Sequence, residues 1–474
     1  MTTGHNIKVI PLGLNDQFKP MDNIRSLLFF LFHDSLNHEL LKSSLDTLIR
    51  KHLPILGARL HRNKSTNYLE YHLPQPFPEN YILFDWSTST HDTTLEAASL
   101  IPQSVPAETG PSFGPLSIPE IEARITPQGW PVLRKDEKPG CPLLLVHIVK
   151  YTNGTVLALN LPHSVGDQMG FGSVVRAWLQ VASGQEPTPF LELDAGSLDG
   201  DPNLSRKELK VKGRYRLKGK RDTLGGVMGM VPELMVNKKE IRRVLYLPTT
   251  LIDNLRTKFN DKIKESGKQL TLTNGDVISA LLLKLTYLAR KSPKWVTCSS
   301  ALNVRGRLPS LPQEKPYLHN AVLWSSFRVP MTKTTPLFDI AMDHRLSVIE
   351  GLKPDTIVRN LTVLHEMVRQ GESIHIIEPW ETSYGITNWC GAWRDLDFRP
   401  VVLKPDANGN KAEQQYGSFP VVYGHSLERK NPTRFNAQIM CKVNGGYWCD
   451  FTASVKAMAA VDLLFEEDPS LESI

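Results

Sequence analysis

A histidine and an aspartate four residues apart, His163 and Asp167, are the side chains whose types and spacing could do chemistry together. They lie where an apolar run, 155–161, gives way to a helical pattern. Loops held by rigid elements are common places for reactive side chains. A neutral imidazole has a reference pKa close to working pH, so it can take a proton from an alcohol or amine that attacks an acyl carbon. Direct attack of this kind needs no serine or cysteine nucleophile.

The spacing of this pair leaves three interpretations open. It could bind a metal ion, but no third His, Asp or Glu clusters nearby in the sequence, and we expect no metal. His163 could be an ordinary loop residue and Asp167 a helix N-cap, which is the default for such a pair in an arbitrary sequence. His163 could also be a general base, with Asp167 keeping the loop in shape rather than accepting the proton.

The segments around the loop predict the elements that hold it. Residues 142–151 and 155–161 have strand patterns and are joined across Asn153-Gly154, a strong hairpin signal. A helix with a regularly spaced apolar face follows Asp167. The loop therefore ends the second strand of a hairpin and begins a helix.

Strand and helix patterns are mixed along the rest of the chain. Residues 26–33 predict a buried strand, 38–52 a helix, and 77–119 a surface loop with a short helix. Further on, Thr273 or Asn274 can cap a long apolar helix. Both halves combine strands with helices, which predicts a mixed α/β fold.

The length and composition limit the class of protein. The chain has 474 residues, which suits about two to three domains. Its 41% apolar and 22% charged residues are typical of a soluble globular protein. The net charge of +6 is too small to argue for nucleic acid, although a local concentration of it would suit a small anionic ligand.

Targeting and redox signals are few. The five cysteines are scattered without metal-ligand spacing, which predicts reduced thiols. The N-terminus has no secretory pattern, and the longest early apolar run is far too short to span a bilayer. We therefore expect a cytoplasmic protein with no membrane partner.

Changes in composition predict two domains and a crossover. Residues 1–204 are expected to form an N-terminal domain that carries the histidine loop, and 241–474 a C-terminal domain whose segment near 380–400 packs on the first. Residues 205–240 form the crossover between them, in which 206–221 is strongly basic. This basic run is either a solvated linker or a phosphate-attracting rim beside a ligand channel, and both interpretations remain open.

The sequence HSVGD in its strand–loop–helix setting resembles the HxxxD motif of the BAHD acyltransferases, a CoA-dependent family related in fold to chloramphenicol acetyltransferase. Other stretches resemble further motifs of this family, in order and over nearly the whole chain. They are LLKSSLDTLIRKHLPILGARL (40–60), LTNGDVISALLLK (272–284), LNVRGRLPSLP (302–312), HNAV (319–322) and ITNWCGAWRDLDFRP (386–400). The resemblance implies two chloramphenicol acetyltransferase-like domains, each a mostly antiparallel or mixed sheet with flanking helices, around a solvent channel.

The resemblance also implies a role for each matching residue. His163 would be the general base, and Asp167 would pair with Arg305 to hold the loop. Trp389, together with Thr387, would lie near the oxyanion of the tetrahedral intermediate.

Other matching residues are expected away from the base. Asp397 and Phe398 match the start of the family's DFGWG motif, which is structural. The residues expected toward coenzyme A are Thr271, Thr273, Lys210 and Arg214.

The sequence departs from the family pattern at three places. The family usually has Gly directly after the motif's Asp, where Gln168 stands here. Because Gly lets backbone and ligand approach closely, we expect Gln168 to narrow or reshape the channel. Arg399-Pro400 replace the remainder of DFGWG, and Asn303 replaces the usual Asp before Arg305. These departures predict a divergent member of the family, and the segment 272–284 resembles the style of its fungal members.

The resemblance implies an acyl-CoA-dependent O-acyltransferase that acts on a hydroxyl of a terpenoid, polyketide or alkaloid, with acetyl the donor expected from its frequency in the family. Acyl-CoA would be a co-substrate rather than a permanent cofactor. We expect a monomer with no nucleic-acid partner. Two alternatives stay open: N-acylation of an amine by the same residues, and a relative without acyl transfer that binds or cyclises a hydrophobic metabolite.

Overall fold

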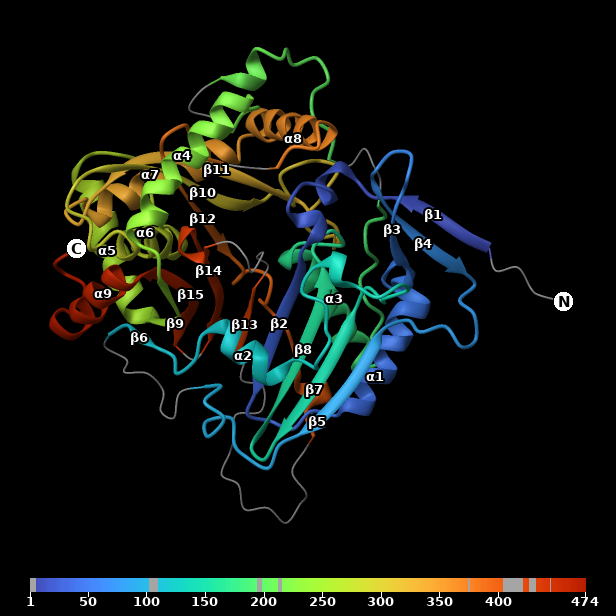
Figure 1. The fold of residues 1–474 in the computed structure, drawn as a ribbon. Helices are drawn as coiled ribbons and strands as arrows, with labels where there is room; N and C mark the ends of the chain where they lie inside the picture. Colours follow the sequence, from blue (N-terminus) through green and yellow to red (C-terminus); the bar gives the residue numbers. More distant parts are fainter. Residues whose placement is uncertain are drawn as a thin grey trace.

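The computed structural model describes the chain outside a few short segments. The described residues are 6–101, 110–193, 198–211, 215–373, 376–403, 421–425, 432–443 and 445–474. They form two lobes, each built on a large β-sheet, with a small third sheet beside the first lobe (Figure 1). The mixed α/β fold predicted from the sequence is confirmed.

The first lobe is built on a five-stranded sheet. In spatial order its strands are β13 (Val421–His425), β2 (Arg25–Phe32), β8 (Gly154–Pro162), β7 (Leu145–Tyr151) and β5 (Asp85–Thr90). Every residue of β2 and β8 is buried, as their apolar runs predict. The prediction of a surface loop with a short helix over 77–119 missed a strand, because β5 lies there, parallel to β7 at the sheet edge. The polar sequence of β5, DWSTST, does not predict a strand by itself, and pairing with β7 stabilises it.

Helices cover the first sheet. They are α1 (His38–Thr47), α2 (Ile118–Ile125) and α3 (Gln168–Ala182). The indole N–H of Trp178 on α3 donates to the Leu41 carbonyl of α1 at 2.9 Å, which ties these two helices together. The single helix expected over 38–52 changes instead into a π-helical turn at Leu48–His52.

The second lobe is built on a seven-stranded sheet. Its spatial order is β11 (Val322–Met331), β10 (Lys294–Asn303), β12 (Thr382–Asn388), β14 (Asn436–Val443), β15 (Gly446–Ser454), β9 (Glu240–Pro248) and β6 (Ser112–Phe113). Strand β12 is parallel to both of its neighbours. The helices of this lobe are α5 (Thr249–Glu265), α6 (Asn274–Thr286), α7 (Leu337–Gly351), α8 (Pro354–Arg369) and α9 (Val455–Glu467). Thr273 caps α6, as one of the two predicted caps.

The two lobes exchange segments of chain. Strand β6 comes from the first half of the sequence and pairs in the second sheet, whereas β13 comes from the second half and pairs with β2. Phe398 packs against Phe30 and Phe32 of the first lobe. The small sheet contains β1 (Asn6–Pro11), β4 (Leu69–Gln75) and β3 (Arg59–Arg62).

The crossover is more structured than a linker. Helix α4 (Lys220–Val236) occupies its second part, although Gly and Pro residues weaken the helical signal there. The helix packs through Gly225, Gly226 and Gly229 against the segment 377–381. Close packing therefore stabilises a helix that the composition disfavours. In the described part of the chain, no helix is long and apolar enough to cross a membrane.

Candidate active site

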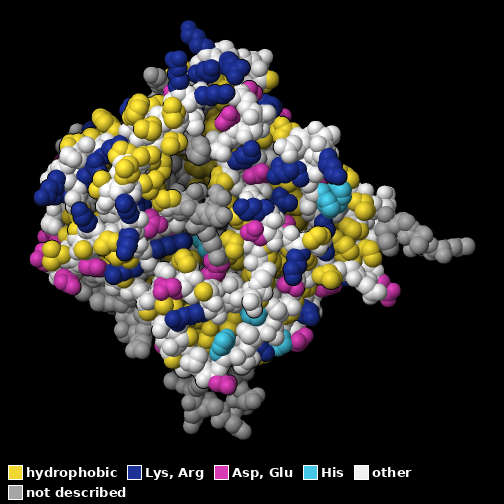
Figure 2. Space-filling view, in the orientation of Figure 1, with side chains coloured by type: hydrophobic (Ala, Val, Ile, Leu, Met, Phe, Trp, Pro, Cys, Tyr) yellow, Lys and Arg dark blue, Asp and Glu magenta, His cyan; other side chains and the backbone are white. Residues whose placement is uncertain are grey.

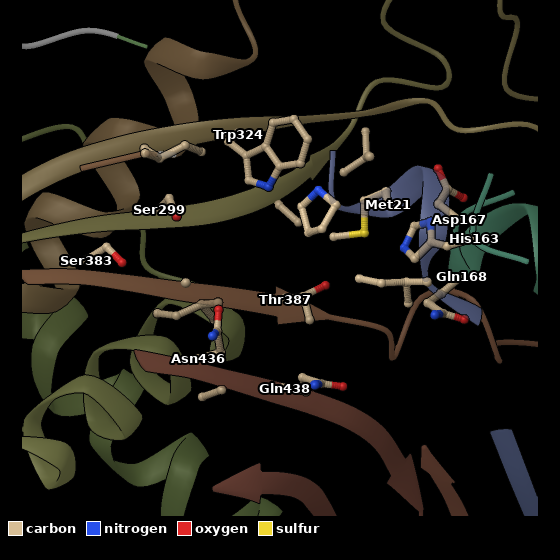
Figure 3. Close-up of a pocket in the computed structure, with 18 of the residues that line it drawn as sticks. Met21, His163, Asp167, Gln168, Ser299, Trp324, Ser383, Thr387, Asn436 and Gln438 are labelled. Carbon is tan, nitrogen blue, oxygen red and sulfur yellow. The ribbon is translucent and has the colours of Figure 1, made fainter. Parts of the chain in front are cut away.

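A cavity of about 380 Å³ lies between the two lobes. From the first lobe it is lined by His163, Gln168 and the N-terminal segment around Met21. The second lobe contributes residues on or next to its sheet, and Figure 3 shows several of them on one side of the cavity with His163 on the other. The residues contributed by the second lobe include Ser299, Trp324, Ser383, Thr387, Asn388, Trp389, Asn436 and Gln438.

The imidazole of His163 faces this cavity from the end of β8 (Figure 3). Burial lowers its pKa from the ordinary 6.5, because desolvation disfavours the charged ring. Nδ1 is buried and has no partner among the described residues. Nε2 is therefore the ring nitrogen that a ligand can reach. A neutral imidazole with an open nitrogen can accept a proton.

The backbone of His163 is held on both sides. Its N–H donates to the carbonyl of Ile24 at 2.9 Å, and its carbonyl accepts from the side-chain amide of Asn320 at 2.8 Å. The first bond anchors the loop to the strand region beside β2, and the second anchors it to the start of β11 in the other lobe. The ring position is thus fixed by both lobes at once.

Asp167 has two structural roles, one through each carboxylate oxygen. Its Oδ1 accepts from the Gly170 N–H at 2.9 Å and caps α3. Its Oδ2 accepts from Arg305 Nη1 and from the Ala321 N–H, each at 2.9 Å. The predicted ion pair between Asp167 and Arg305 is present, and the helix cap that was its alternative is present as well. Figure 3 shows the carboxylate turned away from the ring of His163.

Arg305 fastens the loop to the second lobe through several bonds. Its Nη2 donates to the carbonyls of Tyr317 at 3.1 Å and His319 at 2.6 Å. Asn303 replaces the Asp usual at this position, and its Oδ1 accepts from Arg305 Nη1 at 3.1 Å. Asn303 is exposed, and its amide oxygen binds the guanidinium without adding a second negative charge beside Asp167.

Two glycines allow α3 to approach the second lobe. A Cβ at Gly166 would lie 2.3 Å from the carbonyl oxygen of Leu318, and a Cβ at Gly170 would lie 1.8 Å from it. No side chain could be accommodated without moving this backbone. The Gly residues near the motif therefore set the distance across which Asp167 reaches Arg305.

Behind this loop lies a buried polar cluster. Asp16 Oδ1 accepts from the backbone and side-chain N–H groups of Asn320, at 2.9 and 2.7 Å. Its Oδ2 lies 3.8 Å from Nδ1 of His319. Burial raises the pKa of Asp16 to about 7, and burial lowers the pKa of His319 to about 3. The N-terminal segment therefore supports the same asparagine that holds His163.

Trp389 and Thr387 lie on the second-lobe side of the cavity. The indole N–H of Trp389 donates to Thr387 Oγ1 at 3.1 Å, and its backbone N–H donates to the Ile439 carbonyl at 2.8 Å. The indole is therefore already bonded within the protein. The Thr387 hydroxyl keeps its own proton available for a ligand, and Figure 3 shows it pointing into the same space as His163.

Three of the residues expected toward coenzyme A, namely Lys210, Thr271 and Thr273, do not line this cavity. Thr271 and Lys210 are exposed, and Thr273 hydrogen-bonds Asp276 as the cap of α6. Arg214 lies outside the described residues. Their contact with coenzyme A remains a prediction.

Part of the basic run serves the packing of the crossover. Arg216 pairs with Glu378 and Asp222, and Lys218 donates to the Ile377 carbonyl. These two cations hold the crossover against the second lobe.

The remnant of the DFGWG motif lies away from the cavity. Phe398 is buried in the core of the first lobe, and Asp397 forms an exposed pair with Arg399 at 2.7 Å. Gln168 lines the cavity and donates to Ser26 Oγ at 3.3 Å, so it occupies space that Gly would leave open. Among the described residues, no cluster of His, Cys, Asp or Glu is arranged to hold a metal ion.

Sequence reasoning missed several residues of the site. Asp16 gave no signal, because its partner Asn320 is 304 positions away. Asn320 lies within the HNAV segment, but its bond to His163 depends on the approach of the two lobes. Polar residues that line the sheet side of the cavity also went unpredicted, since nothing in their strand sequences distinguishes them from other polar residues. They are Ser299, Ser383, Asn436 and Gln438.

The two α/β lobes with a cavity between them have the predicted chloramphenicol acetyltransferase-like fold. Residues 123–333 match the Transferase family. The chain is 24% identical to the acetyltransferase adrJ of Penicillium rubens, over 88% of this chain and 87% of that protein. It is also 24% identical to the O-acetyltransferase PaAT-2 of Phomopsis amygdali, over 93% and 94%.

A solved structure shares the fold over almost the full length. TRI101 of F. sporotrichioides, complexed with coenzyme A and T-2, aligns with a TM-score of 0.68 and 13% identity over 97% of this chain and 98% of that one. These matches agree with the family resemblance that the sequence predicted. The prediction of an acyltransferase with this fold is confirmed.

The buried ion pair provides a test of how the loop is held. We expect Arg305→Met to lower the free energy of unfolding by about 3–5 kcal/mol, because Asp167 would be left buried without its cation. Arg399→Met is the matched control, because its pair with Asp397 is exposed and should contribute little to stability. Urea denaturation measures both. Equal losses in the two variants would contradict the structural role of Arg305.

The raised pKa of Asp16 predicts a pH dependence of stability. The folded state keeps the proton up to about pH 7, whereas the unfolded state loses it near the ordinary 3.8. Stability that comes from Asp16 is thus present below pH 3.8 and is lost as pH rises toward 7.

Asp16→Asn mimics the protonated side chain and should remove this dependence. The variant and the wild type should be similarly stable near pH 4, and the variant should become the more stable one toward pH 7. Urea denaturation across this range measures the difference. A difference that does not change with pH would show that Asp16 does not titrate in the folded protein.

Proposed function

We propose that the protein is an acyl-CoA-dependent O-acyltransferase that transfers an acyl group, expected to be acetyl, to a hydroxyl of a specialised metabolite. The observation that carries this proposal is the neutral, loop-anchored imidazole of His163 at the cavity between two lobes of this fold. The named relatives that are acetyltransferases and the TRI101 complex with coenzyme A and T-2 support it.

The reaction follows from the position of His163. The acceptor hydroxyl donates a hydrogen bond to Nε2 and loses its proton to it while its oxygen attacks the thioester carbonyl. A C–O bond forms and the carbonyl oxygen becomes an oxyanion. The tetrahedral intermediate then collapses, the C–S bond breaks, and the leaving thiolate of coenzyme A takes the proton from the imidazolium. The histidine is returned neutral, and no acyl-enzyme forms.

Thr387 is the donor best placed to stabilise the oxyanion. The indole N–H of Trp389 donates to its oxygen, so the hydroxyl proton is directed elsewhere and can point to the cavity. Trp389 is then a positioning residue for Thr387 rather than the direct oxyanion donor. A donor fixed before the reaction stabilises developing charge without reorganisation.

The cavity wall fits a hydrophobic acceptor with a few polar groups. Met21, Ile24 and Trp324 are apolar, and the amides of Asn436 and Gln438 are the polar contacts opposite them. A bulky apolar metabolite that presents one hydroxyl to His163 matches this wall. We further propose that the protein acts as a cytoplasmic monomer. Amine acceptors, the alternative open from the sequence, would use the same base.

His163→Ala tests the proposed base. With acetyl-CoA and a panel of hydroxylated metabolites, we expect acceptor-dependent release of free thiol to fall by about 10²–10⁴-fold. The matched control is His91→Ala, a histidine outside the cavity lining, which should keep wild-type release. Thiol release that survives the loss of His163 would rule out its role as base. Calorimetry that detects no binding of coenzyme A would favour the alternative without acyl transfer.

The pKa of His163 adds a second readout. Because burial lowers this pKa, the imidazole is neutral at and above pH 6.5, and protonation removes the base only below that value. We expect kcat/KM to be flat above pH 6.5 and to fall on the acid side. An acid limb above pH 6.5 would mean that another group is the base.

Thr387→Val tests the oxyanion donor. We expect kcat to fall by about 10²–10³-fold with little change in KM, because the lost bond forms only in the transition state. Thr387→Ser should restore most of the rate, since it keeps the hydroxyl. Ser383→Ala is the control on the same strand and cavity wall. A change in KM alone would assign Thr387 to substrate binding.

A further inference from the structure

Helix α4 turns an apolar stripe to the solvent. Leu224, Val227, Met228 and Met235 follow helical spacing, and their exposed fractions are 63%, 54%, 43% and 68%. Figure 2 shows hydrophobic side chains gathered on this part of the surface, where Figure 1 places α4. A contiguous exposed patch of this kind marks an interaction site more often than a folding requirement.

The stripe faces outward because the opposite face of the helix is fixed. A Cβ at Gly229 would lie 2.1 Å from the Glu381 carbonyl oxygen, and a Cβ at Gly225 would lie 2.8 Å from Pro379. The glycine face must therefore pack on the protein. The helix cannot rotate to bury its larger apolar side chains.

A tryptophan beside the helix is exposed as well. Trp380 is 66% exposed, and its backbone N–H donates to the Gly225 carbonyl at 2.8 Å. Its φ of +70° is in the left-handed region, which is strained for a bulky residue. An exposed indole on strained backbone gains nothing from burial in this fold. Tryptophan is, however, the side chain that favours a membrane–water interface.

Cations flank both ends of the stripe. Lys220 and Arg221 begin the helix, and Lys238 and Lys239 follow its end. None of the four forms an ion pair with another described residue. The acidic residues of the helix are already engaged, because Asp222 pairs with Arg216 and Glu233 with Arg290. The charge left on this surface is therefore positive.

We propose that α4 and Trp380 form a docking surface for anionic lipid at a membrane. The apolar stripe would enter the boundary between headgroups and acyl chains, and the four flanking cations would contact lipid phosphates. A second copy of the chain fits less well. Both ends of α4 are basic, so two stripes packed in either direction would bring like charges together.

This surface lies next to the cavity but does not depend on the proposed reaction. Met230 on α4 and the neighbouring Ile377 both line the cavity. Docking would bring a lipid surface close to a wall of the site. The inference departs from the sequence-based expectation of no membrane partner, which rested on the lack of a spanning segment. A surface contact needs no such segment.

Vesicle co-sedimentation of the full chain tests the proposal. We expect binding to vesicles of phosphatidylcholine with about 30% phosphatidylserine and much weaker binding to phosphatidylcholine alone. Lys238→Glu with Lys239→Glu should lower the partition coefficient by at least about fivefold for each lysine. The matched control is Lys264→Glu with Lys268→Glu, which changes the same net charge on another exposed segment.

The apolar stripe is tested separately. Leu224→Ser with Met235→Ser should reduce binding by about tenfold or more. Ile82→Ser with Leu463→Ser is the control, since both side chains are more than half exposed elsewhere. Unchanged thermal midpoints would show that all variants fold. No binding to the anionic vesicles, or equal losses in the control variants, would overturn the proposal. A dimer seen by light scattering that Leu224→Ser with Met235→Ser dissociates would also overturn it, in favour of a second copy.

Discussion

The ion pair between Asp167 and Arg305 is the constraint on which the site depends. It joins the end of β8 and the start of α3 in one lobe to the segment after β10 in the other. The same carboxylate caps α3 and accepts the N–H of Ala321, so helix, loop and second lobe share one anchor. A charge of this kind is stable in a dry interior only when its partners are complete. Because Arg305 and Ala321 belong to the second lobe, the loop at Asp167 is stable only when the two lobes are packed together.

Burial at this loop also affects His163, the proposed base. His163 is desolvated, so its imidazole stays neutral, and its backbone is held by Ile24 and Asn320 on opposite sides. Gly166 and Gly170 permit the close backbone approach to Leu318 that this arrangement needs. This rigidity suits the proposed role of His163, because a base that must meet an acceptor gains from being fixed before the reaction.

Much of the local structure could be predicted from the sequence. The hairpin over Asn153-Gly154, the cap at Thr273 and the apolar runs of β2 and β8 depend on neighbouring residues, and the structure contains them. Elements that are stabilised by contacts distant in the sequence were harder to predict. Strand β5 is polar and pairs at a sheet edge, and α4 has glycines that only its packing partner justifies. Their local patterns gave no reason to expect them.

The sequence by itself indicated the family resemblance and the candidate site residues, because the HSVGD motif and its accompanying segments occur in order along the chain. It also determined that Asp167 and Arg305 could pair. Only the tertiary structure decided that Asp16 and Asn320 stand behind His163, and that Trp389 hydrogen-bonds Thr387. The contacts of Asn320 with Asp16 and His163 form only when the two lobes pack together. The bond between Trp389 and Thr387 depends on the conformation of the chain at the end of β12. Their energy comes from desolvation and geometry in the folded molecule, which no local pattern encodes.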